Sequence, residues 1–240
     1  MARALDECDQ AESAIIVFLD FETTGLDVTK DEIVEVGALD ARAGAVFSIV
    51  VCLGDVPASP AVHGIDPAEI TEGPPFPEVW RRFVASVDGA VSMAAVSDDS
   101  DSSQENAPGL HTALSENPPV LVLAAHNGLP FDFAMLLCEC LRHNVSLAPL
   151  QRWLFVDMLA MLQTHRNVSE CMKLQCVVRF AGQVENLRAH RALDDCYALN
   201  GVIQHVAWRR GVSLWALMRD FALALDLPAS CAQISLLVGD

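Results

Sequence analysis

The chain has 240 residues, of which 52% are hydrophobic and 20% charged, and its formal net charge is −17. This length suits one α/β domain with a buried core and is too short for two full domains. No run of about 18 or more apolar residues occurs, and acids rather than bases precede the first apolar segment, so the composition excludes a membrane span and a signal peptide. An intracellular protein is expected, in either cytoplasm or nucleus.

The excess of acidic residues is confined to one half of the chain. Residues 1–119 hold 22 acids and 5 bases, whereas residues 120–240 hold 10 of each. A long basic surface for a polyanion is therefore not expected, although the second half can supply a local basic track. The eight cysteines include no CxxC pair, which is unlike a disulfide scaffold or a zinc ribbon, so most should be reduced core thiols.

The first part of the chain predicts three antiparallel strands. Residues 14–21 (AIIVFLDF) form an apolar, β-branched run that ends in acids and a Thr-Thr-Gly turn. Residues 33–40 and 45–51 are the next two strands, and the segment DARAG between them is typical of a hairpin loop. These three strands form the antiparallel start of a sheet.

Helices and single strands alternate in the rest of the chain. Asp66-Pro67 opens a short helix. The further predicted elements are a helix over 76–87, strands over 120–125 and 153–156, and helices over 131–143, 157–164, 172–181, 192–210 and 214–225. Residues 97–107 (SDDSDSSQENA) lack large apolar side chains, so we expect residues 88–119 to form an exposed, flexible, acidic insertion. The order of elements predicts the α/β class, with a mixed sheet flanked by helices.

Two carboxylates stand at the end of the first predicted strand. Asp20 and Glu22 flank Phe21, and residues two apart on a strand project from the same face. Crowded there, they would repel each other unless a divalent cation neutralised them, and oxygen ligands favour Mg²⁺ or Mn²⁺. Considered alone, the two acids are explained more simply as a solvated pair at a strand end.

A second group of polar residues follows the strand over 120–125. The sequence AHNGLPFDF breaks the strand at Asn127 and starts a helix near Asp132. Asp132 can act as a helix cap and Asn127 as a turn residue without any further role. By themselves, these residues do not establish a functional site.

A third group, HRALDD, precedes the helix over 192–210. On a continuous helix His190 would pair with Asp194 at i, i+4, leaving Asp195 on another face. If His190 lies in the preceding loop, Asp195 can reach bound metal ions while the imidazole faces a substrate as general base, since its unperturbed pKa is about 6.5. A purely structural histidine remains the alternative.

Together the three groups resemble the motifs of the DEDDh exonucleases, a DnaQ-like family. FLDFETTGLD is similar to the first motif, AHNGLPFDFAML to the second and HRALDDC to the third. Intervening segments also match, namely DEIVEVGAL, AVHGIDPAEI, GPPFPEVW and VDMLAML, so the resemblance covers residues 15–204 apart from the acidic insertion. AHNG and the following DF look most like the three-prime repair exonucleases, and DFETTGLD and VHGI like the proofreading subunit of bacterial replicative polymerase.

The resemblance implies an RNase H-like fold and one exonuclease domain over residues 1–240. It implies 3′→5′ hydrolysis of phosphodiester bonds, DNA being favoured, with release of nucleoside monophosphates. Four carboxylates would hold two Mg²⁺ or Mn²⁺ ions beside a histidine general base: Asp20, Glu22, Asp132, Asp195 and His190. By analogy Asp20 would bridge both ions. Glu22 and Asp195 would bind the ion that carries the attacking water, and Asp132 would assist at the other.

Six further residues are implied as contacts to the terminal nucleotide: Thr23, Thr24, Leu26, His63, Asn127 and Phe131. The partner would be a nucleic-acid 3′ end, preferably single-stranded, and no membrane. Without a long basic surface, binding should be weak and should depend on metal ions and strand-end contacts. The three-prime repair enzymes also raise a homodimer as the assembly.

Two other functions stay open at this point. One is an RNA-trimming enzyme of the same fold, which contacts to the 2′-hydroxyl would separate from a DNA enzyme. The other is a catalytically silent nucleic-acid-binding module.

Overall fold

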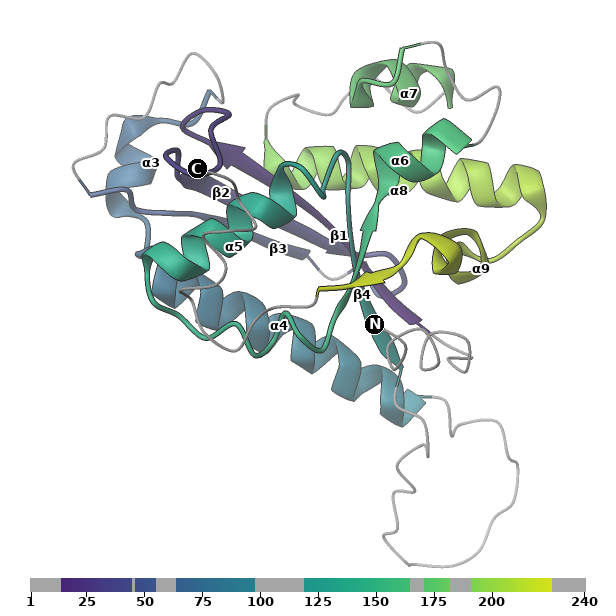
Figure 1. Cartoon of the computed structure of the whole chain (residues 1–240), viewed down its shortest axis with the longest axis horizontal. Coiled ribbons are helices and arrows are strands. Elements are labelled where there is room, and N and C mark those ends of the chain that lie inside the picture. The colour runs from purple at the N-terminus through teal and green to yellow at the C-terminus, as the bar shows by residue number, and fades with distance from the viewer. Residues whose placement is uncertain are drawn as a thin grey trace, which may run out of the picture.

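A computed structural model describes residues 14–44, 46–54, 64–97, 119–164, 171–181 and 191–225 of the protein. Within these residues a six-stranded sheet has the order β3-β2-β1-β4-β5-β6 (Figure 1). The strands are β1 (Ala14–Thr23), β2 (Ile33–Asp40), β3 (Val46–Val50), β4 (Val120–Ala125), β5 (Leu154–Asp157) and β6 (Leu223–Ala224).

The pairing of the strands confirms the predicted mixed sheet. β2 runs antiparallel to both β1 and β3, whereas β4 runs parallel to β1, and β5 parallel to β4. The carboxyl ends of β1, β4 and β5 therefore lie at the same end of the sheet, and predicted functional residues stand there at the ends of β1 and β4.

Helices cover both faces of the sheet (Figure 1). They are α3 (Pro67–Glu72), α4 (Phe76–Ser97), α5 (Asp132–Arg142), α6 (Met158–Thr164), α7 (Leu174–Phe180), α8 (Ala192–Arg210) and α9 (Leu214–Met218). Helices α4 and α5 pack on one face, and α6, α7, α8 and α9 on the other. None of the described helices has the length and apolar character needed to cross a membrane.

Side chains along β1 point alternately to the two faces of the sheet, and this alternation decides which face carries the acids. Ile15, Val17 and Leu19 belong to the core beneath α4 and α5, whereas Ile16 and Phe18 belong to the core beneath α8. Both faces of the strand are buried, which explains its continuous apolar run. Because side chains alternate, the even-numbered acids that follow Phe18 project on the α8 side.

The helix predicted over residues 76–87 extends as α4 to Ser97. Its first turns are anchored by Trp80 and Phe83, whose rings both lie 6.0 Å from that of Trp153. The alanine-rich residues that follow favour continuation of a helix once it has started. Residues 88–97 of the expected insertion are therefore helical, and residues 98–118 lie outside the described residues.

The prediction of one helix over residues 214–225 is wrong at its carboxyl end. Helix α9 ends at Met218, a 3₁₀ turn spans Arg219–Phe221, and β6 then pairs antiparallel with β5. The apolar spacing fits a helix, but β5 offers unpaired backbone groups at the edge of the sheet. A short strand satisfies them, so tertiary pairing overrides the local preference.

The cysteines differ from the expectation in one respect, because Cys171 and Cys176 form a disulfide. Cys176 lies in the first turn of α7 and bonds to Cys171, three residues before the start of that helix, a spacing that the CxxC rule does not cover. The other cysteines in the described part of the chain are free thiols, and Cys140 and Cys196 are buried as expected.

Candidate functional site

The first two predicted acids stand at the carboxyl end of β1. Asp20 is half-buried and Glu22 is buried, both on the face that α8 covers. The pairing with β2 shifts its register between Glu22 and Thr23, as at a β-bulge. Such an irregularity bends a strand and redirects its side chains, and bulges are frequent beside functional sites.

The third acid, Asp195, comes from a distant part of the sequence. It lies in the first turn of α8, next to the end of β1. One carboxylate oxygen from each of Asp20, Glu22 and Asp195 lies within 4.8 Å of the others. The structure therefore brings together the acids that the first and third motifs predicted. Asp20 and Glu22 project from the same face of β1, as their spacing of two residues predicts, and Asp195 faces them from the start of α8.

Asp132 is the first residue of α5 and is 3% exposed. It does not cap the helix, because the cap position is Phe131 and no side chain bonds there. Its carboxylate instead accepts hydrogen bonds from the backbone N–H groups of Phe21 and of Asp132 itself. It lies beyond the 4.8 Å set but close enough that its charge acts on Asp20.

Burial and mutual repulsion shift the protonation of this acidic cluster, which comprises Asp20, Glu22, Asp132 and Asp195. Burial raises the pKa of Asp20, and the charges of Asp132 and the other acids raise it further. Burial and the charge of Asp195 raise the pKa of Glu22 to about 8. The pKa of Asp132 is also raised, chiefly by burial, although its backbone hydrogen bonds oppose the change.

The donor atoms of the cluster fit a divalent cation. All are carboxylate oxygens, the ligands that hard cations such as Mg²⁺ and Mn²⁺ prefer. A cation placed among them would offset the repulsion that raises the pKa values of Asp20 and Glu22.

The loop after β4 supplies two of the predicted substrate contacts. Asn127 is exposed and has a left-handed backbone, with φ 62°, which asparagine tolerates better than most residues. Phe131 is half-buried against the core. The backbone N–H of Leu129 donates to Asp157 at 3.2 Å, so the end of β5 holds this loop in place.

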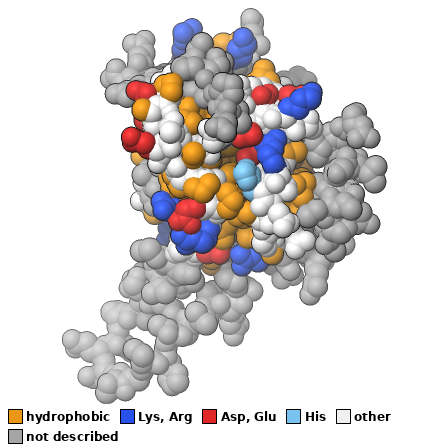
Figure 2. Space-filling model, turned by 90° about the vertical axis from the view of Figure 1, so that its left-hand side faces the viewer, with side chains coloured by type: hydrophobic (Ala, Val, Ile, Leu, Met, Phe, Trp, Pro, Cys, Tyr) orange, Lys and Arg blue, Asp and Glu red, His pale blue; other side chains and the backbone are white. Residues whose placement is uncertain are grey.

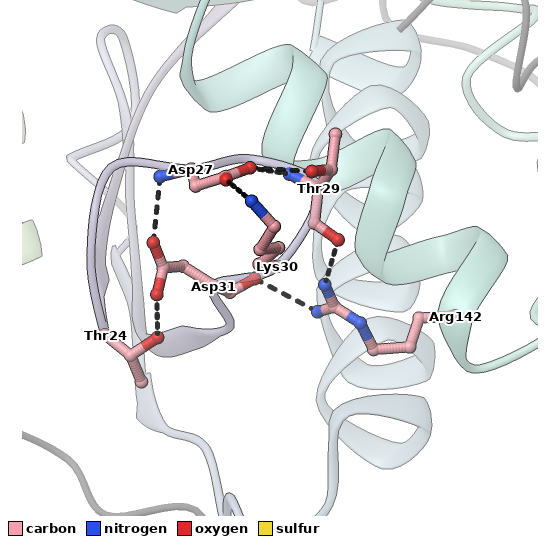
Figure 3. Close-up of polar contacts among 6 residues, drawn as sticks. All are labelled: Thr24, Asp27, Thr29, Lys30, Asp31 and Arg142. Atoms are coloured by element: carbon pink, nitrogen blue, oxygen red, sulfur yellow. Dashed lines mark hydrogen bonds and ion pairs between the residues drawn. The ribbon is translucent and has the colours of Figure 1, made fainter. Parts of the chain in front are cut away.

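The loop after β1 holds three more predicted contacts. The Thr23 hydroxyl donates to the carbonyl of Gly25 at 2.7 Å, and the Thr24 hydroxyl donates to Asp31 at 3.1 Å (Figure 3). Both threonines therefore shape the turn. Leu26 stands at its tip with 83% of its side chain exposed, an unusual position for leucine. Asp31 fills the space beside Gly25, where a Cβ would lie 2.4 Å from its carboxylate.

Further contacts close the same loop (Figure 3). The carboxylate of Asp27 accepts hydrogen bonds from Thr29 and from Lys30 Nζ, the latter at 2.6 Å. The hydrogen bond from Lys30 is the main reason that the pKa of Asp27 falls to about 2. Arg142 of α5 donates to the carbonyl oxygens of Thr29 and Asp31 at 3.3 and 3.1 Å. The loop between β1 and β2 is thus tied to α5.

Two predicted site residues, His63 and His190, lie outside the described residues. Their neighbours are described. Residues 64–66 lead into α3, and Arg191 occupies the N-cap position of α8.

Several of the described basic residues are engaged with acids. Arg81 and Arg82 pair with Glu78, and Arg142 pairs with Glu139. On the face shown in Figure 2, the described Lys and Arg side chains lie scattered among acidic and apolar ones rather than gathered in one patch.

Two buried acids beside the site were missed by the sequence analysis. Glu35, 1% exposed, interrupts the otherwise apolar strand β2, and a lone charge in such a strand is itself a signal of a buried partner. Asp157, 7% exposed, ends β5 and accepts hydrogen bonds from Leu159 and Ala160 at the start of α6. A carboxylate between a strand and a helix is typical of an N-cap and was visible in the sequence.

A mixed sheet of this order, flanked by helices and with acids gathered at the end of its central strand, is typical of the RNase H-like fold. The RNase_T exonuclease family model matches residues 17–105. The matched residues contain the first of the three motifs, and the match agrees with the resemblance to the DnaQ-like exonucleases that the motifs indicated.

Two curated relatives are similar in sequence. Exonuclease DPD1, chloroplastic/mitochondrial, of Arabidopsis thaliana is 27% identical over 241 residues, which cover 96% of this chain and 68% of that protein. A DNA polymerase III subunit epsilon-like protein of Rhodobacter capsulatus is 43% identical over 99 residues, which cover 38% of this chain and only 14% of that protein.

Solved structures share the fold. Cell-death related nuclease 4 (CRN-4) superposes with a TM-score of 0.57 at 14% identity, covering 83% of this chain and 65% of that one. E. coli Exonuclease I in complex with a 5cy-dT13 oligonucleotide superposes with a TM-score of 0.59 at 16% identity, covering 85% of this chain and 43% of that one. The chain thus spans less than two thirds of the length of these neighbours.

Proposed function

We propose that this protein is a metal-dependent 3′→5′ exonuclease that removes nucleoside monophosphates from the 3′ end of nucleic acid, with DNA favoured. The observation that carries the proposal is the meeting of Asp20, Glu22 and Asp195 within 4.8 Å. These acids come from segments far apart in the sequence, in a chain whose residues 17–105 match an exonuclease family model. Repelling carboxylates are unfavourable in a protein interior unless they serve a bound cation.

We assign the metal ligands to four carboxylates, Asp20, Glu22, Asp132 and Asp195. Two Mg²⁺ or Mn²⁺ ions bound there would supply a polarised water and neutralise the charge that develops on the phosphodiester. The charge of Asp20 acts with those of the other three acids, which suits a residue shared between two ions. The hydrogen bonds from backbone N–H groups to Asp132 fix the direction of its carboxylate.

We assign the role of general base to His190. Helix α8 begins at Ala192, and the backbone of its N-cap residue Arg191 is extended. This favours the loop position over the i, i+4 pairing with Asp194. A neutral imidazole nitrogen there would accept the proton of the attacking water near neutral pH.

Six residues would contact the terminal nucleotide: Thr23, Thr24, Leu26, His63, Asn127 and Phe131. The exposed Leu26 offers an apolar surface to a base, and Phe131 an aromatic one. Several E. coli Exonuclease I structures contain oligonucleotides, and one is described as a complex with single-stranded DNA. By likeness of fold, we propose a single-stranded 3′ end as the preferred ligand.

The domain organisation also belongs to the proposal. The described helices and strands from β1 to β6 share one sheet and its two faces. We propose one exonuclease domain that carries an acidic insertion after α4. The homodimer suggested by the three-prime repair enzymes stays a prediction, to be checked by light scattering.

The test compares wild type with Asp195→Ala on 5′-labelled single-stranded DNA, duplex DNA and RNA, each with Mg²⁺, Mn²⁺ or a chelator. Wild type should shorten single-stranded DNA stepwise from its 3′ end only when metal is present, and Asp195→Ala should not. Asp194→Ala is the matched control, since it removes the same charge from the adjacent position and should stay active. Faster digestion of RNA would change the substrate to RNA, and an inactive wild type that binds DNA would favour the silent module.

A further inference from the structure

Glu35 is a buried carboxylate outside the acidic cluster, and the proposed function gives it no role. Its side chain lies in the interior of β2, and burying a charge is unfavourable unless hydrogen bonds satisfy it. The Glu35 oxygens accept from Arg191 Nε at 3.1 and 3.2 Å, from Arg191 Nη2 at 2.9 Å and from the backbone N–H of Ala192 at 3.1 Å. One carboxylate of β2 thus holds both a side chain and the backbone at the start of α8.

The position of Glu35 on β2 relates it to the acids of β1. In the antiparallel pairing of the two strands, Glu35 stands opposite Glu22, and Gly37 stands opposite Asp20. Directly opposite residues project from the same face of a sheet. The two β2 residues that contact α8 are therefore the cross-strand neighbours of the two β1 carboxylates.

The backbone of β2 also touches the first turn of α8 directly. A Cβ on Gly37 would lie 2.4 Å from the carbonyl carbon of Ala192, so only glycine allows this approach. The Cys196 thiol donates to the Gly37 carbonyl at 3.3 Å. Asp195 thus lies between two attachments of α8 to β2. On its N-terminal side, Arg191 and Ala192 bind Glu35, and on its C-terminal side, Cys196 binds Gly37.

We propose that Glu35, acting through Arg191, is a positioning residue that fixes Asp195 in its place against Asp20 and Glu22. The inference rests on the proposed exonuclease function, because it states what the pair does for that site. The bidentate contact fits this role, since a planar guanidinium held by two oxygens restricts rotation as well as distance. An ion pair that only stabilised the fold would not need to lie beside β1, the strand that carries Asp20 and Glu22.

The test is Glu35→Gln, which keeps the volume and one acceptor for Ala192 but removes the charge that holds Arg191. We expect kcat on single-stranded DNA to fall by about 10- to 100-fold, with KM changed little, and the half-saturating Mn²⁺ concentration to rise. Calorimetric titration of Mn²⁺ without substrate should show the same loss of affinity. Hydrogen exchange in the metal-free protein should quicken at the Ala192 amide and not in β4.

Arg191→Gln and the double variant Glu35→Gln/Arg191→Gln complete a cycle, and the double variant should be no worse than either single one because neither charge is left unpaired. Glu69→Gln is the control, since Glu69 lies 3.8 Å from Arg191 but is half exposed, and it should behave as wild type. If Glu35→Gln does not fold, Arg191→Lys, which keeps the charge but loses the planar fork, takes its place.

Wild-type kcat and Mn²⁺ affinity in a variant that merely melts earlier would overturn the inference, leaving the pair a structural one. If the wild-type protein digests no nucleic acid, the proposed function fails by itself. The Mn²⁺ titration and the exchange of the Ala192 amide then still decide whether Glu35 positions Asp195.

Discussion

Two groups of acids are held in opposite ways, although members of both stand close together in the sequence, Asp20 and Glu22 in β1 and Asp27 and Asp31 in the loop that follows. In the loop between β1 and β2, the carboxylates of Asp27 and Asp31 accept hydrogen bonds from backbone, hydroxyl and ammonium donors. The pKa of Asp27 accordingly falls to about 2, chiefly through Lys30. In the acidic cluster, burial and neighbouring acids raise the pKa of Glu22 to about 8.

The difference separates acids that stabilise the folded state from acids that destabilise it. Carboxylates with lowered pKa values stabilise the folded state at neutral pH, whereas those with raised values oppose folding there. The loop satisfies its acids with its own donors. In the acidic cluster, burial and mutual repulsion outweigh the favourable contacts from the chain, and a bound divalent cation would offset them.

The largest expected effect comes from making the same change in both groups. Asp20→Asn should abolish exonuclease activity, by on the order of 10³-fold or more, because a ligand that stabilises the transition state is lost. The melting temperature of the metal-free variant should nevertheless rise by a few degrees, because one repelling charge is gone.

Asp27→Asn is the counterpart in the loop, and it should act in the opposite sense. It should lower the melting temperature slightly, because the exposed carboxylate that accepts from Thr29 and Lys30 is lost, and should leave activity nearly intact. Calorimetry in chelator and a gel assay with Mn²⁺ measure both quantities. Destabilisation by both substitutions would contradict the distinction between the groups.

Much of this arrangement was predictable from local patterns. The bounds of β2, β4 and α8 agree with the sequence, since apolar runs there end at turn residues or polar caps. The gathering of Asp20 and Asp195 was also predictable, because each stands where a strand ends or a helix begins.

The features that the sequence did not predict depend on contacts between segments that are far apart in the chain. Glu35 and its partner Arg191 are separated by 156 residues, so no local pattern connects them. β6 forms only because β5 offers an open edge. The placement of Asp132 depends on its hydrogen bond to the backbone of β1, which decided against a helix cap. His63 and His190 stay predictions.

A smaller effect should appear in the pH dependence of stability without metal. The pKa of Glu22 rises from its usual 4.5 to about 8 on folding, so the folded state binds more protons between these values and stability falls as pH rises. The useful window is about pH 6.5 to 8, because burial lowers the pKa values of His126 and His143 and they titrate below it. Asp27 and Glu78, with pKa values lowered to about 2, do not titrate there either.

The melting temperature in chelator should therefore fall across that window, by on the order of 5 °C. Saturating Mn²⁺ or Mg²⁺ should flatten the slope, because a bound cation favours the ionised carboxylates. Glu22→Gln should reduce it without metal, and the raised pKa values of Asp20 and Asp132 should account for what is left. An equal slope in the wild type with and without metal would show that the acidic cluster binds no ion.

The smallest expected effect tests whether the loop serves the site only by holding its shape. Asp31→Ala removes the acceptor of Asp27 N and Thr24 Oγ1, at 2.8 and 3.1 Å, and empties the space beside Gly25. Losing these hydrogen bonds should cost about 1–2 kcal/mol and let the tip of the loop move. Because the tip carries Leu26, KM for single-stranded DNA should rise by about 3- to 10-fold while kcat stays close to that of wild type.

Lys30→Met is the matched change on the same loop. Its ion pair with Asp27 is short, but the Lys30 side chain is 79% exposed, and an exposed pair contributes little. It should therefore leave KM within about twofold of wild type. A fall in kcat for Asp31→Ala as large as that for Asp20→Asn would mean that the loop takes part in the chemistry. The two acidic groups would then form one functional unit, although their carboxylates are held so differently.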